Sequence, residues 1–224
     1  MKKTFSVMIA MITLLTLLAG SFALADGDSW YCTNCGATRT SDFCPDCGAH
    51  RPTGNRAWPV KQLNGVSTAL KKLGDDSQRH QSTLGPDRKR YPGGGAYKPY
   101  KVTSASALFR EGNYVLVDMA YQTVGRRCVY FKASSLTNAK VDEWSLTAYP
   151  ARVTGTVEPK YGPGNDYDTV VLDTKTKNGS SRQTITLNSG TQVDAFFEAN
   201  GWVFAEFNCA LGLIRAWLPA NSVE

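Results

Sequence analysis

The chain is poor in histidine, and the two histidines that it has, His50 and His80, both lie in its first half. A catalytic dyad or triad that uses histidine as its general base needs that side chain beside the nucleophile. The two later cysteines, Cys128 and Cys209, have no histidine after them, and Cys128 lies in a strand-like stretch. A cysteine hydrolase is therefore only a minor alternative, and we expect a protein without catalytic activity.

Clustered acidic residues are also scarce. Asp166, Asp168 and Asp173 form one loose group around a Gly-Pro loop. A carboxylate pair for acid–base chemistry stays open there, although aspartate is a common turn former and needs no catalytic reason in such a loop.

Charge is absent from residues 4–25, a run rich in large apolar side chains. Lys2 and Lys3 precede this run, and Ala23-Leu24-Ala25 provides small residues at a cleavage site before Asp26. This pattern predicts a secretory signal peptide over residues 1–25 and a secreted or envelope-associated protein. No cysteine follows Leu18-Ala19-Gly20, which argues against a lipoprotein anchor. An uncleaved segment that spans the membrane is the alternative.

Two Cys-x-x-Cys pairs follow the apolar run, and each is followed by a glycine, Gly36 or Gly48. The four cysteines are Cys32, Cys35, Cys44 and Cys47. Two such turns supply four thiolates, enough for a closed tetrahedral structural zinc site. The pattern resembles a zinc ribbon, which we expect over residues 26–50, with His50 as a solvated neighbour. Two disulfides are the alternative, because an oxidising compartment favours them.

The segment after the cysteines carries positive charge. Residues 51–95 hold nine basic side chains against three acidic ones, and prolines and glycines interrupt any periodic pattern. We expect a basic linker over residues 51–89, either a solvated tether or a contact to an anionic surface such as wall polymers or membrane headgroups. We expect no nucleic acid partner for a secreted protein.

The end of the chain has the alternation of β-strands. Val193, Ala195 and Phe197 share one face, Asn200-Gly201 is a tight hairpin signal, and a second alternating run starts at Trp202. A glycine turn at Gly212, an apolar strand and a terminal x-x-Ser-hydrophobic pattern that ends at Val223 complete the stretch. This order resembles the bacterial Src-homology-3 (SH3) domain, expected over residues 150–224, with its first loop at Tyr161–Gly164 and its first strand at residues 169–172.

An earlier stretch repeats the same signals, and we expect a second SH3-like unit over residues 90–137. The matched pairs are Tyr114 with Trp202, Gly125 with Gly212, Tyr130 with Trp217, Phe131 with Leu218, Ser135 with Ser222, and Leu136 with Val223. The predicted fold class is therefore mainly β, a small zinc ribbon and two SH3-like barrels joined by an irregular linker.

The SH3 resemblance implies a peptide groove lined by aromatic rings. The candidate ligand-binding residues are Tyr161, Tyr167, Trp202 and Trp217 in the later unit, and Tyr97, Tyr100, Tyr114 and Tyr130 in the earlier one. Core packing is the alternative for each, above all for the two tryptophans. Arg126, Arg127 and Arg215 are either solvated or available to a carboxylate. Cys128 and Cys209 are either buried thiols or a disulfide between the units.

These expectations combine into a non-catalytic extracytoplasmic binding protein. Its SH3-like units would dock on peptidoglycan peptides or another anionic wall polymer, with zinc in a structural role. The alternative is a scaffold for another surface protein, and the minor alternative is a wall hydrolase. A membrane contact is expected only if the signal segment stays uncleaved.

Overall fold

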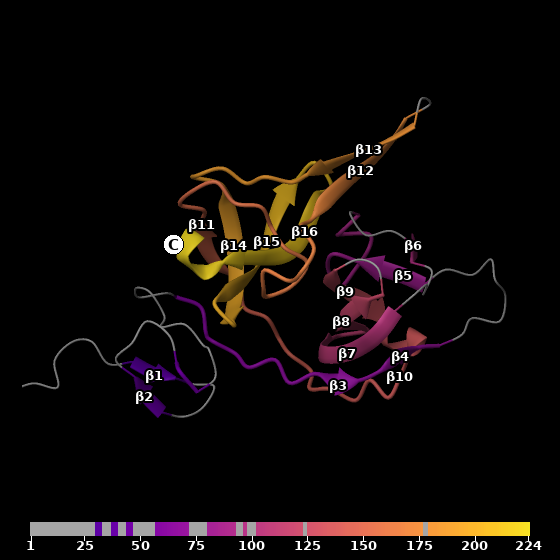
Figure 1. Ribbon diagram of the computed structural model, residues 1–224, viewed down its shortest axis with the longest axis horizontal. Helices are drawn as coiled ribbons and strands as arrows, with labels where there is room; N and C mark the ends of the chain where they lie inside the picture. The colour runs from indigo at the N-terminus through magenta and orange to yellow at the C-terminus, as the bar shows by residue number, and fades with distance from the viewer. Residues whose placement is uncertain are drawn as a thin grey trace, which may run out of the picture.

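The predicted mainly β fold is confirmed, and its sheets are antiparallel (Figure 1). The computed structural model describes residues 30–32, 37–39, 44–46, 57–71, 80–92, 96–97, 102–122, 125–176 and 179–224. The predicted signal peptide lies outside them. Helix within these ranges is limited to two 3₁₀ turns, η2 (Ala133–Ser135) and η3 (Ala220–Ser222).

A six-stranded sheet and a two-stranded ladder make up what we call the N-terminal unit, residues 66–137 (Figure 1). The sheet order is β3 (Val66–Ser67), β7 (Val102–Glu111), β8 (Tyr114–Tyr121), β9 (Arg126–Lys132), β5 (His80–Thr83) and β6 (Ala96–Tyr97). The ladder joins β4 (Ala69–Leu70) to β10 (Leu136–Thr137).

A four-stranded sheet forms the C-terminal unit, residues 149–224. Its order is β11 (Tyr149–Arg152), β14 (Gln192–Ala199), β15 (Trp202–Cys209) and β16 (Gly212–Pro219). A hairpin of β12 (Val171–Thr176) and β13 (Gly179–Thr184) extends away from this sheet (Figure 1). A separate short hairpin pairs β1 (Trp30–Cys32) with β2 (Ala37–Arg39) near the start of the chain.

The two units repeat one topology. In each, a first strand pairs with a long strand, which continues through two hairpins into a 3₁₀ turn. The long strand has a bulge at the same place, between Ala107 and Phe109 in β7 and between Ala195 and Phe197 in β14. After the 3₁₀ turn the chain returns to the residues that directly follow the first strand, since Leu136 pairs with Leu70 and Val223 with Val153.

The first strand of each unit differs from the sequence-based expectation. Residues 51–89, predicted to be a linker, supply β3, β4 and β5, so the N-terminal unit starts well before residue 90. In the C-terminal unit the first strand is β11, whereas residues 169–172, expected in that role, lead into the β12–β13 hairpin. Both first strands are short and are followed by long loops, so neither gives a hairpin signal in the sequence.

The sheets of both units are open, and the residues that the structure describes form no closed barrel. The SH3-like barrels and the zinc ribbon therefore stay predictions. The turn between β14 and β15 follows its sequence signal closely. Asn200 and Gly201 both have positive φ, 53° and 75°, as a two-residue β-hairpin turn requires.

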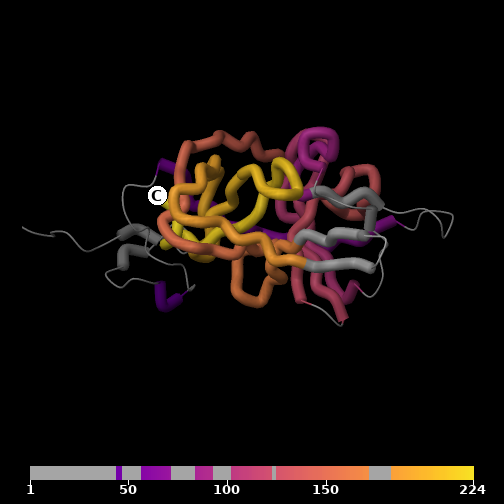
Figure 2. The backbone as a smooth tube through the Cα atoms, turned by 90° about the horizontal axis from the view of Figure 1, so that it is seen from above, coloured from indigo at the N-terminus to yellow at the C-terminus, as the bar shows by residue number. Residues whose placement is uncertain are grey.

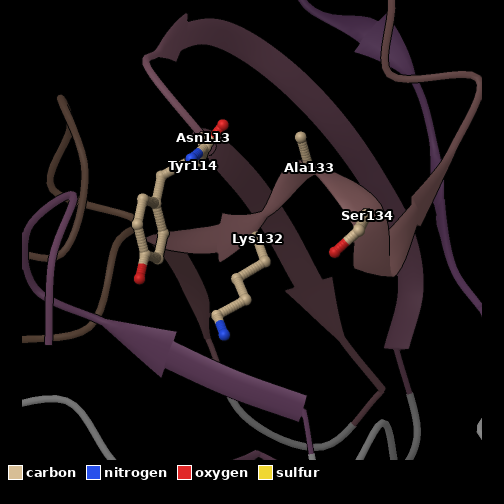
Figure 3. Close-up of a pocket in the computed structure, with 5 residues that line it drawn as sticks. All are labelled: Asn113, Tyr114, Lys132, Ala133 and Ser134. Atoms are coloured by element: carbon tan, nitrogen blue, oxygen red, sulfur yellow. The ribbon is translucent and has the colours of Figure 1, made fainter.

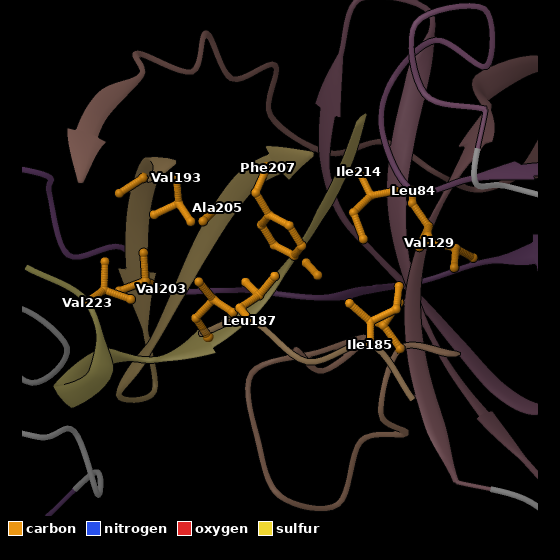
Figure 4. Packing of buried hydrophobic residues seen from close by; sticks show 14 of the residues in the cluster. Leu84, Val129, Ile185, Leu187, Val193, Val203, Ala205, Phe207, Ile214 and Val223 are labelled. Carbon is orange, nitrogen blue, oxygen red and sulfur yellow. The ribbon is translucent and has the colours of Figure 1, made fainter. Parts of the chain in front are cut away.

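One hydrophobic core spans both units, which lie side by side in Figure 2. Figure 4 shows Leu84 and Val129 of the N-terminal unit beside Ile185 and Ile214 of the C-terminal unit. A core that crosses the boundary means that neither unit buries its apolar surface alone.

The boundary between the units is built from equivalent positions on both sides. A second buried cluster places Leu108, Phe109, Leu116 and Tyr130 against their counterparts Phe196, Phe197, Phe204 and Trp217. Phe109 meets Phe197 edge to face, with ring centroids 5.9 Å apart. The contact therefore has the pattern of an isologous dimer interface within a single chain.

The segments that precede the two units are exchanged between them. Before the N-terminal unit, Lys61 donates its backbone N–H to the Glu198 carbonyl of β14 at 2.8 Å. Before the C-terminal unit, Trp144 donates in the same way to the Arg110 carbonyl of β7, also at 2.8 Å. The two segments meet where the Lys61 ammonium lies 4.3 Å from the centre of the Trp144 ring. Each unit is thus completed by the chain that leads into the other.

Candidate binding site

Three of the predicted ligand-binding aromatics lie in the interior. Trp217 and Tyr130 are each 1% exposed, and Tyr167 is 6% exposed. All three belong to the cluster at the boundary between the units. In this chain the aromatic face of each unit is covered by the other unit, so it presents no open groove at these residues.

Among the other candidates, those whose side chains the structure describes lie closer to the surface. Tyr114, Trp202 and Tyr161 are partly buried. Tyr97 is placed by its backbone in β6, and Tyr100 lies outside the described residues. Tyr114 borders a hollow that the described residues define.

This hollow, which we call the Tyr114 hollow, has a volume of about 340 Å³. Its lining comes from the β7–β8 turn, the start of β8, the end of β9 and η2: Asn113, Tyr114, Lys132, Ala133 and Ser134. Figure 3 shows the Tyr114 ring, the Lys132 side chain and the Ser134 hydroxyl around it. Lys132 is exposed, and Lys71 lies nearby with its ammonium donating to the Ser134 carbonyl at 2.8 Å. An aromatic ring beside ammonium groups suits a ligand with a flat apolar part and a carboxylate.

The equivalent place in the C-terminal unit lacks the cation. Tyr114 pairs with Lys132 across β8 and β9, and the corresponding pair across β15 and β16 is Trp202 with Pro219. Proline offers no charge and no donor at this position. The combination of an aromatic ring and an ammonium group on this strand pair is therefore specific to the N-terminal unit.

Buried charges tie the units together close to this site. Glu206 of β15, 5% exposed, accepts from Arg215 Nε at 2.9 Å, from Arg90 Nη2 at 3.0 Å and from the Tyr91 hydroxyl. Arg215 also donates to Glu111 of the other unit at 2.6 Å. Burial, together with the hydrogen bond to Glu206, raises the pKa of Tyr91 above its ordinary value.

The N-terminal unit has a related arrangement around Asp118, the counterpart of Glu206 in β8. Asp118 is 7% exposed and accepts from the Tyr167 hydroxyl at 3.1 Å and from Arg126 Nε at 3.0 Å. Arg126 also lies 4.7 Å from the centre of the Tyr167 ring. Burial is the main reason that the pKa of Tyr167 is raised, with the neighbouring Cys128 and Asp118 adding to it.

The loops that carry the two tyrosines cross between the units. In the loop that leads to Tyr91, the Leu84 carbonyl accepts from the backbone N–H of Arg215 in β16 at 2.6 Å. In the loop that leads to Tyr167, the Tyr161 carbonyl accepts from the backbone N–H of Cys128 in β9 at 2.7 Å. A Cβ atom on Gly85 would overlap the Tyr91 ring, and one on Gly162 would overlap the Tyr167 ring. Each loop thus needs its glycine so that the tyrosine can fold back and reach the other unit's carboxylate.

The predicted arginines are therefore engaged by carboxylates of this chain. Arg127 pairs with Asp168 at 2.5 Å, and Arg126 reaches Asp166 at 3.3 Å, which places two aspartates of the loose acidic group in ion pairs. Sequence reasoning missed Tyr91, Asp118 and Glu206. The available signal was a carboxylate at the same position of two otherwise apolar strands, in Val117-Asp118-Met119 and Ala205-Glu206-Phe207.

The two later cysteines are both free thiols. Cys128 is buried, and burial raises the pKa of its thiol well above the ordinary value, with Asp118 adding to the shift. Cys209 accepts a hydrogen bond from the Leu211 N–H at 3.4 Å and so helps to hold the β15–β16 turn. A buried, protonated thiol is a poor nucleophile.

Two of the four predicted zinc ligands are among the residues that the structure describes. Cys32 ends β1 and Cys44 is buried, whereas Cys35 and Cys47 lie outside the described residues. Among the residues that the structure describes, no three histidine, cysteine or acidic side chains come together to hold a metal ion. The zinc site therefore stays a prediction.

In the described ranges no helix is long and apolar enough to cross a membrane. Comparison with family models, with curated proteins and with solved structures finds no match to this chain.

Proposed function

We propose that the protein is a non-catalytic, extracytoplasmic binding protein whose two units are SH3-like and dock on peptidoglycan peptides or another anionic wall polymer. The order of elements supports the SH3-like assignment. In each unit a short first strand, a long loop, two hairpins and a 3₁₀ turn follow one another before the chain returns to the first strand.

The observation that carries the binding proposal is the Tyr114 hollow. It places an exposed ammonium, that of Lys132, beside an aromatic ring and a serine hydroxyl in a concave site of about 340 Å³. Stem peptides of a cell wall present carboxylates on short extended chains, and a cation beside a flat apolar surface matches that chemistry. Zinc held by Cys32, Cys35, Cys44 and Cys47 would have a structural role in a ribbon ahead of the units.

Co-sedimentation with purified sacculi across a salt series tests this proposal. We expect binding that persists in high salt and falls about tenfold in Lys132→Ala and in Tyr114→Ala. Lys140→Ala is the matched control, because Lys140 is also exposed and lies outside the hollow. Binding lost steeply with salt and equally in all variants would mean that diffuse positive charge is responsible, which overturns the proposed site.

Absence of binding at low salt would overturn the wall-binding function and favour the alternative, a scaffold for another surface protein. Wall-lysing activity that disappears in Cys128→Ala would overturn the non-catalytic assignment.

A further inference from the structure

The two units differ in how far their first strand stays paired with the long strand, that is, β11 with β14 and β3 with β7. In the C-terminal unit the pairing continues to the end, because β11 pairs with β14 from Tyr149 to Arg152. Val153 then donates its N–H to the Thr191 carbonyl at 3.0 Å and accepts from the Gly190 N–H at 2.7 Å. The backbone groups of Val153 are thus bonded to the two residues that lead into β14.

In the N-terminal unit the same strands separate. β3 pairs with β7 at Val66 and Ser67, and Thr68 donates its N–H to the Ala105 carbonyl at 3.0 Å. β4 then turns toward β10, where Leu70 pairs with Leu136. Leu70 is the counterpart of Val153, which faces Val223 in the other unit.

The backbone of Leu70 faces away from β10. Lys71 donates its N–H to the Ser135 carbonyl at 2.9 Å, and successive residues of a strand direct their backbone groups to opposite sides. The N–H and C=O of Leu70 therefore point toward β7. In the part of the chain that the structure describes, β4 forms its ladder with β10 and has none with β7.

A hollow of about 500 Å³ lies where the pairing is missing. We call it the β4–β7 groove, and its walls are residues 67–70 and 102–106. The side chains along it are hydroxyls and small or aliphatic groups, and no residue of either wall carries a charge. Such a surface recognises a backbone and neutral side chains, in contrast to the Tyr114 hollow with its ammonium group.

We propose that the β4–β7 groove accepts an extended, uncharged polypeptide segment as an added strand, hydrogen-bonded to the N–H and C=O of Leu70. The C-terminal unit shows the expected pairing. There, Gly190 donates its N–H to the Val153 carbonyl and the Thr191 carbonyl accepts from the Val153 N–H, and Val153 is the counterpart of Leu70. Strand addition to an exposed edge obtains its affinity from main-chain hydrogen bonds. The groove would give the protein a polypeptide partner in addition to the ligand of the Tyr114 hollow.

The experiment uses a capped hexapeptide with the sequence of residues 188–193, Asn-Ser-Gly-Thr-Gln-Val. This peptide is titrated into the ¹⁵N-labelled protein. We expect saturable shifts of the Leu70 and Thr103 amide signals and at least tenfold slower hydrogen exchange at the Leu70 N–H. A peptide with proline in place of its glycine is expected to give no such shifts, because the glycine N–H is the group that donates to Val153 in the C-terminal unit and proline has no N–H.

Ser104→Trp and Gln192→Trp form a matched pair. Both positions are exposed and occupy the same place in β7 and β14, but only Ser104 lines the groove. We expect Ser104→Trp to weaken peptide binding at least tenfold and Gln192→Trp to leave it unchanged. Equal binding by both variants, no shifts at millimolar peptide, or a Leu70 amide already protected in the free protein would each overturn the proposal.

Discussion

The two units share their scaffold but neutralise their buried carboxylates differently. Glu206 is paired by Arg215, which belongs to the neighbouring strand of the same unit and is 8% exposed. At the position of Arg215 the N-terminal unit has Cys128, and Asp118 is paired instead by Arg126, whose side chain is 44% exposed. Both units have the buried carboxylate at the same position and a tyrosine that donates to it. The arginine that pairs with this carboxylate comes from a different position in each unit.

Some features occur in both units and form the contact between them, and others are specific to one unit. The aromatic cluster, the exchanged leading segments and the crossing loops occur on both sides. The Tyr114 hollow and the β4–β7 groove occur in the N-terminal unit, on surfaces that the contact leaves open. The shared features explain assembly, so the differences are the better guide to binding.

The largest effect is expected from truncating the centre of the contact. Phe197→Ala and Phe109→Ala should each lower the free energy of unfolding by about 3–5 kcal/mol, as is usual for a buried phenylalanine. Because the core is continuous, both variants should unfold in one transition that involves both units. Chemical denaturation followed by near-ultraviolet circular dichroism measures this.

The matched controls are Ser106→Ala and Asp194→Ala, at equivalent positions of β7 and β14 away from the aromatic cluster. They are expected to stay within about 0.5 kcal/mol of the parent. Two separate transitions, one moved by each phenylalanine, would contradict a shared core.

The next effect is expected at the buried ion pair. Arg215→Met leaves Glu206 and Glu111 without their common partner, and we expect a loss of about 3 kcal/mol, the lower end for a broken buried pair, because Arg90 still reaches Glu206. Arg126→Met should cost only about 1 kcal/mol, since its side chain is half exposed and water can replace it.

Urea denaturation of the two variants at one pH compares these losses. Equal losses would show that the cations of the two units are equivalent in spite of their different burial. Arg152→Met, which removes an exposed pair with Glu224, is the control and is expected to have little effect.

The sequence allowed the hairpins to be predicted but not the contact between the units. Tyr114 and Trp202 start their strands, and Leu136 and Val223 follow the 3₁₀ turns, as local turn and alternation signals indicate. The two short first strands have no hairpin partner in sequence, because each pairs with residues about forty positions later. The burial of Trp217, Tyr130 and Tyr167 depends on how two units pack, which alternation along one strand cannot specify.

A smaller effect is expected when the crossing tyrosines lose their hydroxyls. Tyr91→Phe removes one donor from Glu206 and Tyr167→Phe removes one from Asp118, and each should cost about 1–2 kcal/mol at neutral pH. Tyr149→Phe, at a partly exposed position, is the control and should cost little. Thermal unfolding measures the differences, and no loss in either variant would contradict a structural role for the crossing loops.

Alkaline pH provides a second measure of the same two hydroxyls. The pKa values of Tyr91 and Tyr167 are raised by burial, so both hydroxyls stay protonated in the folded protein while the unfolded chain ionises near pH 10. Their contribution to stability is therefore complete below pH 10 and is lost as the pH rises above it. Each phenylalanine variant should lose less stability between pH 9 and pH 11 than the parent. An unchanged pH dependence would contradict burial of these hydroxyls.

The smallest effect is expected where the two leading segments meet. Lys61→Ala removes the ammonium that lies over the Trp144 ring, and we expect a loss of about 0.5–1 kcal/mol, the usual size of a cation–π contact near the surface. Lys61→Met keeps most of the apolar stem and separates lost charge from lost packing. In a double-mutant cycle with Trp144→Leu, the coupling free energy should equal the loss of stability in Lys61→Ala, because the Lys61 ammonium contacts the Trp144 ring. Zero coupling would mean that backbone pairing with Glu198 and Arg110 alone holds the exchanged segments.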